Sequence, residues 1–374
     1  MNLLTLGKYY PPYRGGIETL TRLWCEGFAA RGARVRCVVA HDAPRTVRET
    51  LHHVEVIRCA RFGAAFSTPI APGYLLASRG SWDLLNAHFP NPLADLALLL
   101  ATRRTPLILT YHSDIVRQAG LMRLYQPLLA WLLHRATRIV VATPPQLQHS
   151  AALAPHRAKC EVIPFGLDLR RYQAAPAPPP EIVAARAATR GKPILLNVGR
   201  LVGYKGQRHL IEALPRLEAV AWIVGTGPLR EELAALASTL GVADRVTFWG
   251  DVDDALLPAL MHACDVFVLS SISPNEAFGL VQVEAMACGK PVVSCQLDSG
   301  VPFVNQHAHT GLVVPPRDPV ALAEAVQRLL SDPSLAARLG RAAAARAAQE
   351  FALDVMVTRY WNLLQGVREA GRTA

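Results

Sequence analysis

The 374-residue sequence lacks a long apolar run that is free of charged residues. The run Leu93–Thr110, for instance, is broken by Asp95, Arg103 and Arg104. A membrane-spanning helix needs about 20 predominantly apolar residues in succession, so none is expected. The first residues also lack the basic start and the long apolar stretch of a signal peptide. Together these absences predict a cytoplasmic protein.

Metal-ligand spacing is missing as well. Several of the seven cysteines lie in apolar runs, as buried free thiols do, and the seven are Cys25, Cys37, Cys59, Cys160, Cys264, Cys288 and Cys295. We therefore expect no metal site, no cofactor and thiols that stay reduced, as in the cytoplasm.

The composition that is present is globular, with 51% apolar and 18% charged residues. The length is too great for one ordinary core and suits two domains. The net charge of +10 is unevenly placed, because residues 1–172 hold 21 Lys/Arg and 10 Asp/Glu, whereas residues 173–374 hold 18 and 19. The excess positive charge (21 − 10 = +11) thus lies in the first half.

A basic first half is expected to face an anionic partner. A membrane surface or a polyprenyl diphosphate would suit it, and a solvated arginine-rich surface is the alternative. A Leu-rich basic helix expected near 120–138 would suit an anionic membrane, unless it packs in the core. Nucleic acid is not expected, because the sequence has neither interleaved aromatic residues nor a known nucleic-acid module.

Short apolar runs alternate with helical patterns along the whole chain. The alternation predicts βαβ units and mostly parallel sheets. Strands are expected at 2–6, 34–39, 54–57, 84–87, 107–110, 138–141, 161–163, 194–198, 220–224, 245–248, 266–269 and 291–294. The Pro-rich segment 174–180 is expected to be a linker or a surface loop. We predict an α/β protein with two doubly wound Rossmann-like domains facing a cleft, and ligands at the carboxyl ends of the strands.

The strongest motif follows a predicted strand and runs from Ser270 to Pro291. Glu276 lies in its loop, and Glu284 lies eight residues later in the helix that Gly279 and Leu280 begin. The free N–H groups of a helix start bind anions, while two carboxylates accept hydrogen bonds from sugar hydroxyls. This combination predicts a sugar-nucleotide site. In the alternative, Glu276 caps the helix and Glu284 lies at the surface.

A second motif, 197–206, also follows a predicted strand. Gly199 gives the turn conformational freedom, and Arg200 and Lys205 are two cations that can hold a diphosphate. A solvated basic loop is the alternative. Gly225 follows the next strand and is expected to shape the nucleotide pocket or to make a simple turn.

The first half carries weaker signals. Gly15 and Gly16 open a helix after the first strand, without the spacing of a dinucleotide fingerprint. His88 and His112 end predicted strands, and Asp114 follows His112 closely. Their places predict side chains at the cleft, although a lone histidine is more often structural.

The Glu276–Pro291 stretch resembles the Glu-x7-Glu region of retaining glycosyltransferases of family 4, which adopt the GT-B fold. The resemblance extends over most of the chain and includes the segments 15–16, 111–114, 162–168 and 199–206. The sequence around His112 is similar to that of bacterial mannosyl- and rhamnosyltransferases of surface polysaccharide assembly.

The resemblance implies roles for matching residues. Arg200 and Lys205 would bind the donor diphosphate, Glu284 the ribose and Glu276 the donor sugar. The remaining positions would line the same site: the backbone of Phe278, Gly279 and Leu280 beside the sugar and phosphates, Gly16 from the first domain, and His112 near sugar and acceptor. His88 and Asp114 are acceptor-side candidates, and the helix from about Asp354 would cross back to the first domain.

The implied reaction moves a hexose to a lipid-linked or oligosaccharide acceptor, with retention of the anomeric configuration and without a metal. The first expectation for the hexose is mannose from GDP-mannose. Residues 1–172 and 354–374 would bind the acceptor, and residues 173–353 the nucleotide sugar. The enzyme would work in the cytoplasm, peripheral to the inner face of the membrane. Alternatives are a dTDP-rhamnose or UDP-sugar donor, or a non-catalytic sugar-nucleotide-binding protein of the same fold.

Overall fold

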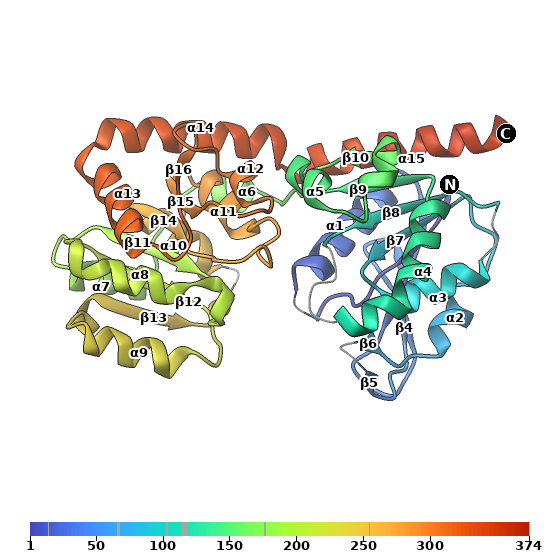
Figure 1. The fold of residues 1–374 in the computed structure, drawn as a ribbon, viewed down its shortest axis with the longest axis horizontal. Helices are drawn as coiled ribbons and strands as arrows, with labels where there is room; N and C mark the ends of the chain where they lie inside the picture. Colours follow the sequence, from blue (N-terminus) through green and yellow to red (C-terminus); the bar gives the residue numbers. More distant parts are fainter. Residues whose placement is uncertain are drawn as a thin grey trace. The chain divides into compact units, whose positions relative to one another are not determined.

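The structure is a computed structural model that describes residues 1–13, 15–65, 68–101, 104–113, 119–175, 177–253 and 255–373. The chain divides into two compact units (Figure 1). The first unit consists of Met1–Gly166 and Leu353–Ala374, and the second of Leu167–Ala352. In the described part of the chain, no helix has both the length and the apolar character that crossing a membrane requires.

The first unit is built on an eight-stranded sheet with the order β10-β9-β8-β7-β1-β2-β4-β3. Its strands are parallel, except that β3 pairs antiparallel with β4 at the edge. The strands are β1 (Asn2–Leu6), β2 (Arg34–Ala40), β3 (Val47–Leu51), β4 (Val54–Cys59), β7 (Leu84–Phe89), β8 (Leu107–Tyr111), β9 (Arg138–Val141) and β10 (Cys160–Val162). A separate pair joins β5 (Ala64–Ala65) to β6 (Thr68–Pro69).

Helices cover both faces of this sheet. They are α1 (Gly16–Ala30), α2 (Gly73–Ala77), α3 (Pro92–Leu100), α4 (Ala119–Arg135), α5 (Pro144–His149) and α15 (Leu353–Thr373). Successive strand residues point to opposite faces. Leu85, Ala87 and Phe89 of β7 therefore join one apolar core with Tyr74 of α2. The opposite face of β7 carries polar side chains and lies under α1 and α15.

The last helix, α15, returns to the first unit, as predicted (Figure 1). The hydroxyl of Tyr360 lies 2.7 Å from Thr110 Oγ1 and 2.8 Å from Asn86 Oδ1, and all three residues are buried. Gly27 of α1 lets the two helices approach closely, because a Cβ there would stand 2.6 Å from Val357 Cγ1. The end of the chain is thus part of the first unit's interior.

The second unit has a six-stranded parallel sheet with the order β13-β12-β11-β14-β15-β16. The strands are β11 (Ile194–Val198), β12 (Val220–Val224), β13 (Val246–Gly250), β14 (Val266–Leu269), β15 (Val292–Cys295) and β16 (Gly311–Val314). The central strands are buried throughout, which explains their continuous apolar sequences. Chain order reverses between β11 and β14, and ligands of such sheets bind at this switch point, beyond the carboxyl ends of the strands.

The helices of the second unit flank this sheet (Figure 1). They are α6 (Arg170–Gln173), α7 (Pro180–Ala188), α8 (Gln207–Ala213), α9 (Arg230–Thr239), α10 (Leu256–Ala263), α11 (Leu280–Ala287), α12 (Val301–Val304), α13 (Pro319–Ser331) and α14 (Pro333–Glu350). Two of them begin with a side-chain cap, since Asp318 accepts from the N–H groups of Val320 and Ala321, and Asp332 from that of Leu335.

The predicted α/β class with two doubly wound units is confirmed. The units change between Gly166 and Leu167, earlier in the sequence than the predicted 172/173. The reason is that Leu167 already joins the second unit, where it bridges Ala352 and donates its N–H to the carbonyl of Phe351. The Pro-rich segment therefore lies within the second unit, between α6 and α7.

Candidate functional site

The residues of the two strongest motifs meet at the switch point of the second unit. Arg200 and Lys205 follow β11, Gly225 follows β12, and Glu276 and Glu284 follow β14. These three strands are neighbours in the sheet and run in the same direction. Their carboxyl ends therefore place all five residues along one edge.

Lys205 and Glu276 form an ion pair at this edge. Lys205 Nζ lies 2.5 Å from Glu276 Oε2, which also accepts a 2.8 Å hydrogen bond from Ser271 Oγ. The two side chains are only 14% and 10% exposed, so solvent screens the pair little. The ammonium and the carboxylate are held in place before any ligand arrives.

The backbone around Gly206 sets the place of Lys205. Gly206 has φ +65°, and a Cβ there would stand 2.1 Å from the carbonyl oxygen of Ser270. Across the same contact, Ser270 Oγ donates to the carbonyl of Lys205 at 3.0 Å, and the N–H of Ile272 donates to that of Tyr204 at 2.8 Å. The loop after β11 is thereby fastened to the loop after β14.

Arg200 lies on the same loop but takes no part in this ion pair. Its side chain is exposed, and its carbonyl accepts from Gln207 Nε2 at 3.1 Å. Gly225 packs against the peptide between Gly199 and Arg200, since a Cβ at Gly225 would stand 2.1 Å from the carbonyl oxygen of Gly199. Of the four predicted charged residues, the structure thus joins Lys205 and Glu276 directly and leaves the guanidinium of Arg200 toward solvent.

The start of α11 is shaped by Gly279, which has φ +70° and leaves no room for a side chain beside Leu269. Gln282 Nε2 donates to the carbonyl of Phe278 at 2.7 Å and braces the turn. Phe278 is buried against Phe351, with the rings edge to face at 5.7 Å. The helix therefore begins at Leu280 on a fixed turn, where the N–H of Gln282 already donates to the carbonyl of Gly279. The first N–H groups of a helix can bind an anion.

Glu284, one turn into α11, is half-buried. Helix α6, which carries Tyr172, packs against α11. Burial and the charge of Glu284 raise the pKa of Tyr172, so this hydroxyl stays protonated.

His88 and His112 form a pair in the first unit. His88 Nδ1 lies 3.0 Å from His112 Nε2, and the rings stack with centroids 5.3 Å apart. Burial lowers the pKa of His112 to about 3, and burial, together with His112, lowers that of His88 well below its ordinary value. Both rings are therefore neutral, and their second nitrogens have no hydrogen-bond partner among the described residues.

Both histidines lie at the carboxyl ends of their strands, where the sequence predicted them, and their side chains are buried. They are only 2% and 5% exposed, because Trp24 of α1 and Phe165 pack over the ends of β7 and β8. Gly16, by contrast, is exposed as the first residue of α1. The last predicted residue of this group, Asp114, lies outside the residues that the structure describes.

Two protein-family models cover most of the chain. The model of glycosyltransferase family 4 matches residues 14–171, and that of glycosyl transferases group 1 matches residues 180–346. O-antigen chain mannosyltransferase C of Escherichia coli is 32% identical over 97% of both chains. The chain belongs to glycosyltransferase family 4.

Other members of the family are similar over shorter stretches. The D-rhamnosyltransferase WbpZ of Pseudomonas aeruginosa is 39% identical over 72% of this chain and 70% of its own. The GDP-mannose-dependent alpha-(1-6)-phosphatidylinositol monomannoside mannosyltransferase of Mycobacterium tuberculosis is 35% identical over 56% of each. Sucrose-phosphate synthase of Thermosynechococcus elongatus has the same GT-B fold, with a TM-score of 0.81, 25% identity and 99% coverage of both chains. The predicted fold and family are confirmed.

One side chain that supports an acid of this glycosyltransferase was not predicted from the sequence. Ser271 donates its hydroxyl to the carboxylate of Glu276. This role of Ser271 could have been predicted, because Ser271 lies in the motif itself and its hydroxyl can donate to a buried carboxylate.

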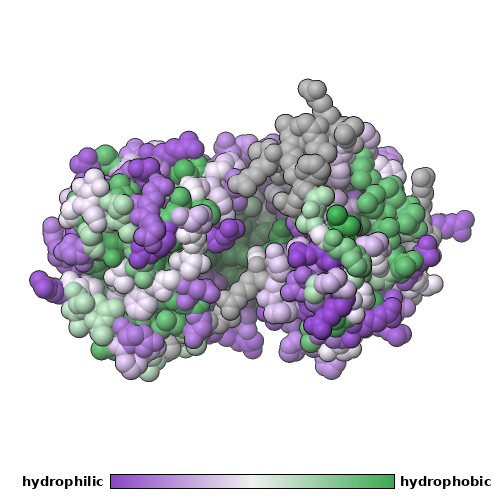
Figure 2. Space-filling view, turned by 90° about the horizontal axis from the view of Figure 1, so that it is seen from below, coloured by the Kyte–Doolittle hydropathy of each residue, from purple (hydrophilic) through white to green (hydrophobic). Residues whose placement is uncertain are grey.

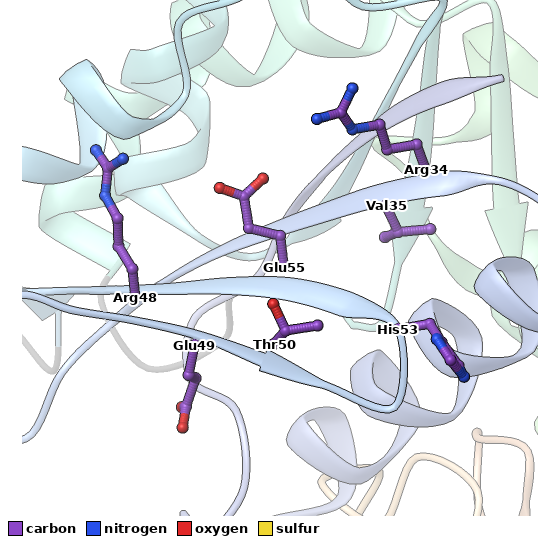
Figure 3. A pocket seen from close by; sticks show the side chains of 7 residues that line it. All are labelled: Arg34, Val35, Arg48, Glu49, Thr50, His53 and Glu55. Atoms are coloured by element: carbon purple, nitrogen blue, oxygen red, sulfur yellow. The ribbon is translucent and has the colours of Figure 1, made fainter.

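A depression elsewhere in the first unit lies over β2 and the β3–β4 hairpin (Figure 3). Figure 3 shows the side chains of Arg34 and Arg48 on the same side as Glu55, with Glu49 turned to the opposite side. Glu55 is paired with Arg36, and Glu49 with Arg58. The acids of this depression are thus already engaged within the sheet, and it contains none of the predicted site residues.

Proposed function

We propose that this glycosyltransferase moves mannose from GDP-mannose to a hydroxyl of a lipid-linked or oligosaccharide acceptor in surface polysaccharide synthesis, with retention of configuration. The observation that carries the proposal is the buried Lys205–Glu276 pair at the switch point. The names of the mannosyltransferase relatives support the sugar, and that of the mycobacterial relative supports the nucleotide.

Lys205 would hold the donor diphosphate together with Arg200. Negative charge grows on the diphosphate as the bond to the sugar breaks. A cation that is already in place stabilises this charge without reorganising, and removal of one such group typically costs about 3 kcal/mol. These two side chains would take the part that a divalent metal plays in other phosphate chemistry.

The two acids would bind hydroxyl groups on either side of the diphosphate. Glu276, held by Lys205 and Ser271, keeps lone pairs for the hydroxyls of the sugar. Glu284 would accept from the ribose. The turn at Phe278, Gly279 and Leu280 would offer its N–H groups to the phosphate, and Gly225 would let the nucleotide approach the backbone.

The first unit, with α15, would bind the acceptor, with Gly16, His88, His112 and Asp114 as its candidate residues. A neutral histidine with so low a pKa is a weak base, but its nitrogen can still hold a hydroxyl by a hydrogen bond. We therefore propose a front-face route. The acceptor oxygen bonds to the anomeric carbon, the bond to the diphosphate breaks, and the acceptor's proton passes to a diphosphate oxygen.

The enzyme would work in the cytoplasm, with the first unit resting on the inner face of the membrane. Most large apolar side chains with high exposure among the described residues belong to this unit, namely Tyr13, Phe62, Ile70, Leu76, Leu96, Leu99 and Leu100. Figure 2 shows an apolar patch on the same unit, at the right of the view. Apolar side chains within a basic unit suit an anionic lipid surface.

A panel of GDP-mannose, UDP-sugars and dTDP-rhamnose tests the function, with release of the nucleotide as the measurement. We expect turnover with GDP-mannose and an α-linked product by NMR. Lys205→Ala should lose at least a hundredfold in kcat and keep its circular dichroism spectrum. Lys192→Ala is the control, because it removes only an exposed pair with Glu218 at the start of β11.

A rhamnosyl donor is the second candidate, since one relative is a D-rhamnosyltransferase. Turnover with dTDP-rhamnose in place of GDP-mannose would select it. Binding of a nucleotide sugar without transfer or hydrolysis would instead identify a non-catalytic binding protein. Full activity of Lys205→Ala would remove the ion pair from the chemistry.

A further inference from the structure

Two serines follow β14 directly and brace the Lys205–Glu276 pair from both of its ends. Ser270 Oγ donates to the carbonyl of Lys205 at 3.0 Å and accepts from Asn197 Nδ2 at 3.2 Å. Ser271 Oγ donates to Glu276 Oε2 at 2.8 Å. The two serines are 1% and 0% exposed, so water does not compete for either hydroxyl.

The two donors to Glu276 reach the same oxygen of its carboxylate. Lys205 Nζ lies 2.5 Å from Oε2, and the Ser271 hydroxyl donates to the same atom. A carboxylate oxygen has about two lone pairs, so these two donors occupy Oε2. Oε1 accepts no hydrogen bond from the residues that the structure describes, and it is not among the enclosed polar atoms without a partner. Oε1 is therefore the oxygen that remains open to a ligand.

Lys205 alone does not determine which oxygen of Glu276 stays open. An ammonium is a compact point charge on a flexible stem, and it attracts either oxygen of a carboxylate equally. The last torsion of a glutamate side chain is also broad, because it joins an sp³ carbon to an sp² carbon. Ser271, by contrast, has a short side chain, and its hydrogen bond is directional. With Ser271 in place, the carboxylate stays turned so that Oε2 meets both donors.

We propose that Ser271 is a positioning residue that fixes the rotation of the Glu276 carboxylate and so selects Oε1 as the oxygen that accepts from the donor sugar. The inference rests on the proposed function, in which Glu276 binds the hydroxyls of that sugar. Ser271 itself touches neither the sugar nor the nucleotide. Its hydroxyl therefore changes how much the sugar adds to the affinity and leaves the affinity for the nucleotide alone unchanged.

Calorimetric titration of the full chain with GDP and with GDP-mannose, without an acceptor, tests this inference. UDP with UDP-glucose and dTDP with dTDP-rhamnose are titrated in parallel, so that whichever nucleotide binds supplies the measurement. Ser271→Ala removes only the hydroxyl. It should lower the affinity for the nucleotide sugar relative to that for the nucleotide by about threefold or more, as the loss of one hydrogen bond does. The affinity for the nucleotide itself should stay within twofold.

Glu276→Gln and the double variant Ser271→Ala/Glu276→Gln distinguish positioning from a merely structural role. Glu276→Gln should lower the same ratio at least as far as Ser271→Ala does. Because Ser271 acts through Glu276, adding Ser271→Ala to Glu276→Gln should change the ratio less than twofold. Ser271→Cys keeps the shape of the side chain and a weak donor, so its ratio should lie between those of the wild type and Ser271→Ala.

Ser273→Ala is the matched control, because Ser273 lies in the same loop and its hydroxyl accepts from the N–H of Asn275 at 3.3 Å. It loses the same atom and should keep the wild-type ratio. A general loosening of the loop weakens the nucleotide and the nucleotide sugar alike. An equal loss for both ligands in Ser271→Ala would therefore overturn the positioning role.

The remaining outcomes separate the two proposals. If Ser271→Ala keeps the wild-type ratio while Glu276→Gln loses it, or if the two changes add in the double variant, the positioning role is overturned and the proposed function stands. A wild-type ratio in Glu276→Gln also overturns the positioning role, and turnover with the donor panel then decides the function separately. A wild type that binds none of the three nucleotides overturns both.

Discussion

Asp95 of α3 is a buried acid whose pKa could not be predicted from the sequence. It is 1% exposed and lies in an apolar helix, where Tyr125 of α4 donates its hydroxyl to the carboxylate. Burial raises the pKa of Asp95 to about 7, far above its ordinary value. Between about pH 4 and pH 7 the folded chain therefore holds a proton that the unfolded chain has lost.

This difference predicts the sign of a pH effect on stability. The contribution of Asp95 is most favourable below about pH 4 and is lost as the pH rises to about 7. Because a pKa unit corresponds to about 1.4 kcal/mol, the free energy of unfolding of the wild type relative to Asp95→Asn should fall by a few kcal/mol over this range. Urea unfolding of both proteins at several pH values measures it.

Comparison with the variant is essential, because His88 and His112 act in the opposite direction. Their lowered pKa values make the unfolded chain bind more protons below about pH 6.5, so they destabilise the fold toward acid. The difference between wild type and Asp95→Asn cancels the histidines. A difference that does not change with pH would show that Asp95 titrates normally.

At the level of elements, the alternation of apolar runs and helical patterns predicted the central strands well. Buried parallel strands such as β12 and β14 have continuous apolar sequences, and few other elements of structure show this pattern. The edge strand β3 was missed, because its sequence Val-Arg-Glu-Thr-Leu alternates with polar residues and its side chains are half-exposed. The short helix α7 was missed because it starts at the last proline of a segment expected to be a linker.

The candidate site was predictable as a set of residues but not as a set of contacts. Parallel strands bring their carboxyl ends to one edge, so the motifs after β11 and β14 had to lie near each other. The sequence does not say which atoms touch across that edge, and the fastening of the two loops through Gly206 appears only in three dimensions. The burial of His88 and His112 depends on Trp24, a residue far away in the sequence.

The close contact between the two loops at Gly206 can be tested by substitution. Gly206→Ala places a Cβ 2.1 Å from a backbone oxygen, whereas Gly241→Ala, at nearly the same φ, meets nothing within 4 Å. The left-handed backbone costs each alanine about 1–2 kcal/mol. The clash should cost Gly206→Ala clearly more and raise the KM for the donor at least tenfold. Urea unfolding and donor kinetics on both variants measure this, and equal effects would show that the loops are not fastened here.

For the whole molecule, the uneven charge was visible in the sequence, but the exposed apolar side chains on the same unit were not, since burial depends on the fold. Leu96, Leu99 and Leu100 lie on α3 and are 46–66% exposed. We expect the wild type to float with anionic vesicles at moderate salt and the triple serine variant of these leucines to bind at least fivefold less.

Val183→Ser and Val320→Ser provide the control for this flotation, because both valines are exposed on the second unit. This double variant should bind vesicles as the wild type does. Binding that is lost equally in both variants, or that is absent in the wild type, would contradict a membrane-facing role of the first unit.

The return of α15 to the first unit has a consequence for how the protein is made. Leu353–Ala374 leaves the ribosome only after every residue of the second unit has been synthesised. Until then, the sheet of the first unit lacks the helix that covers Asn86 and Thr110. A nascent chain that ends before Tyr360 lacks the hydroxyl that lies against Asn86 and Thr110.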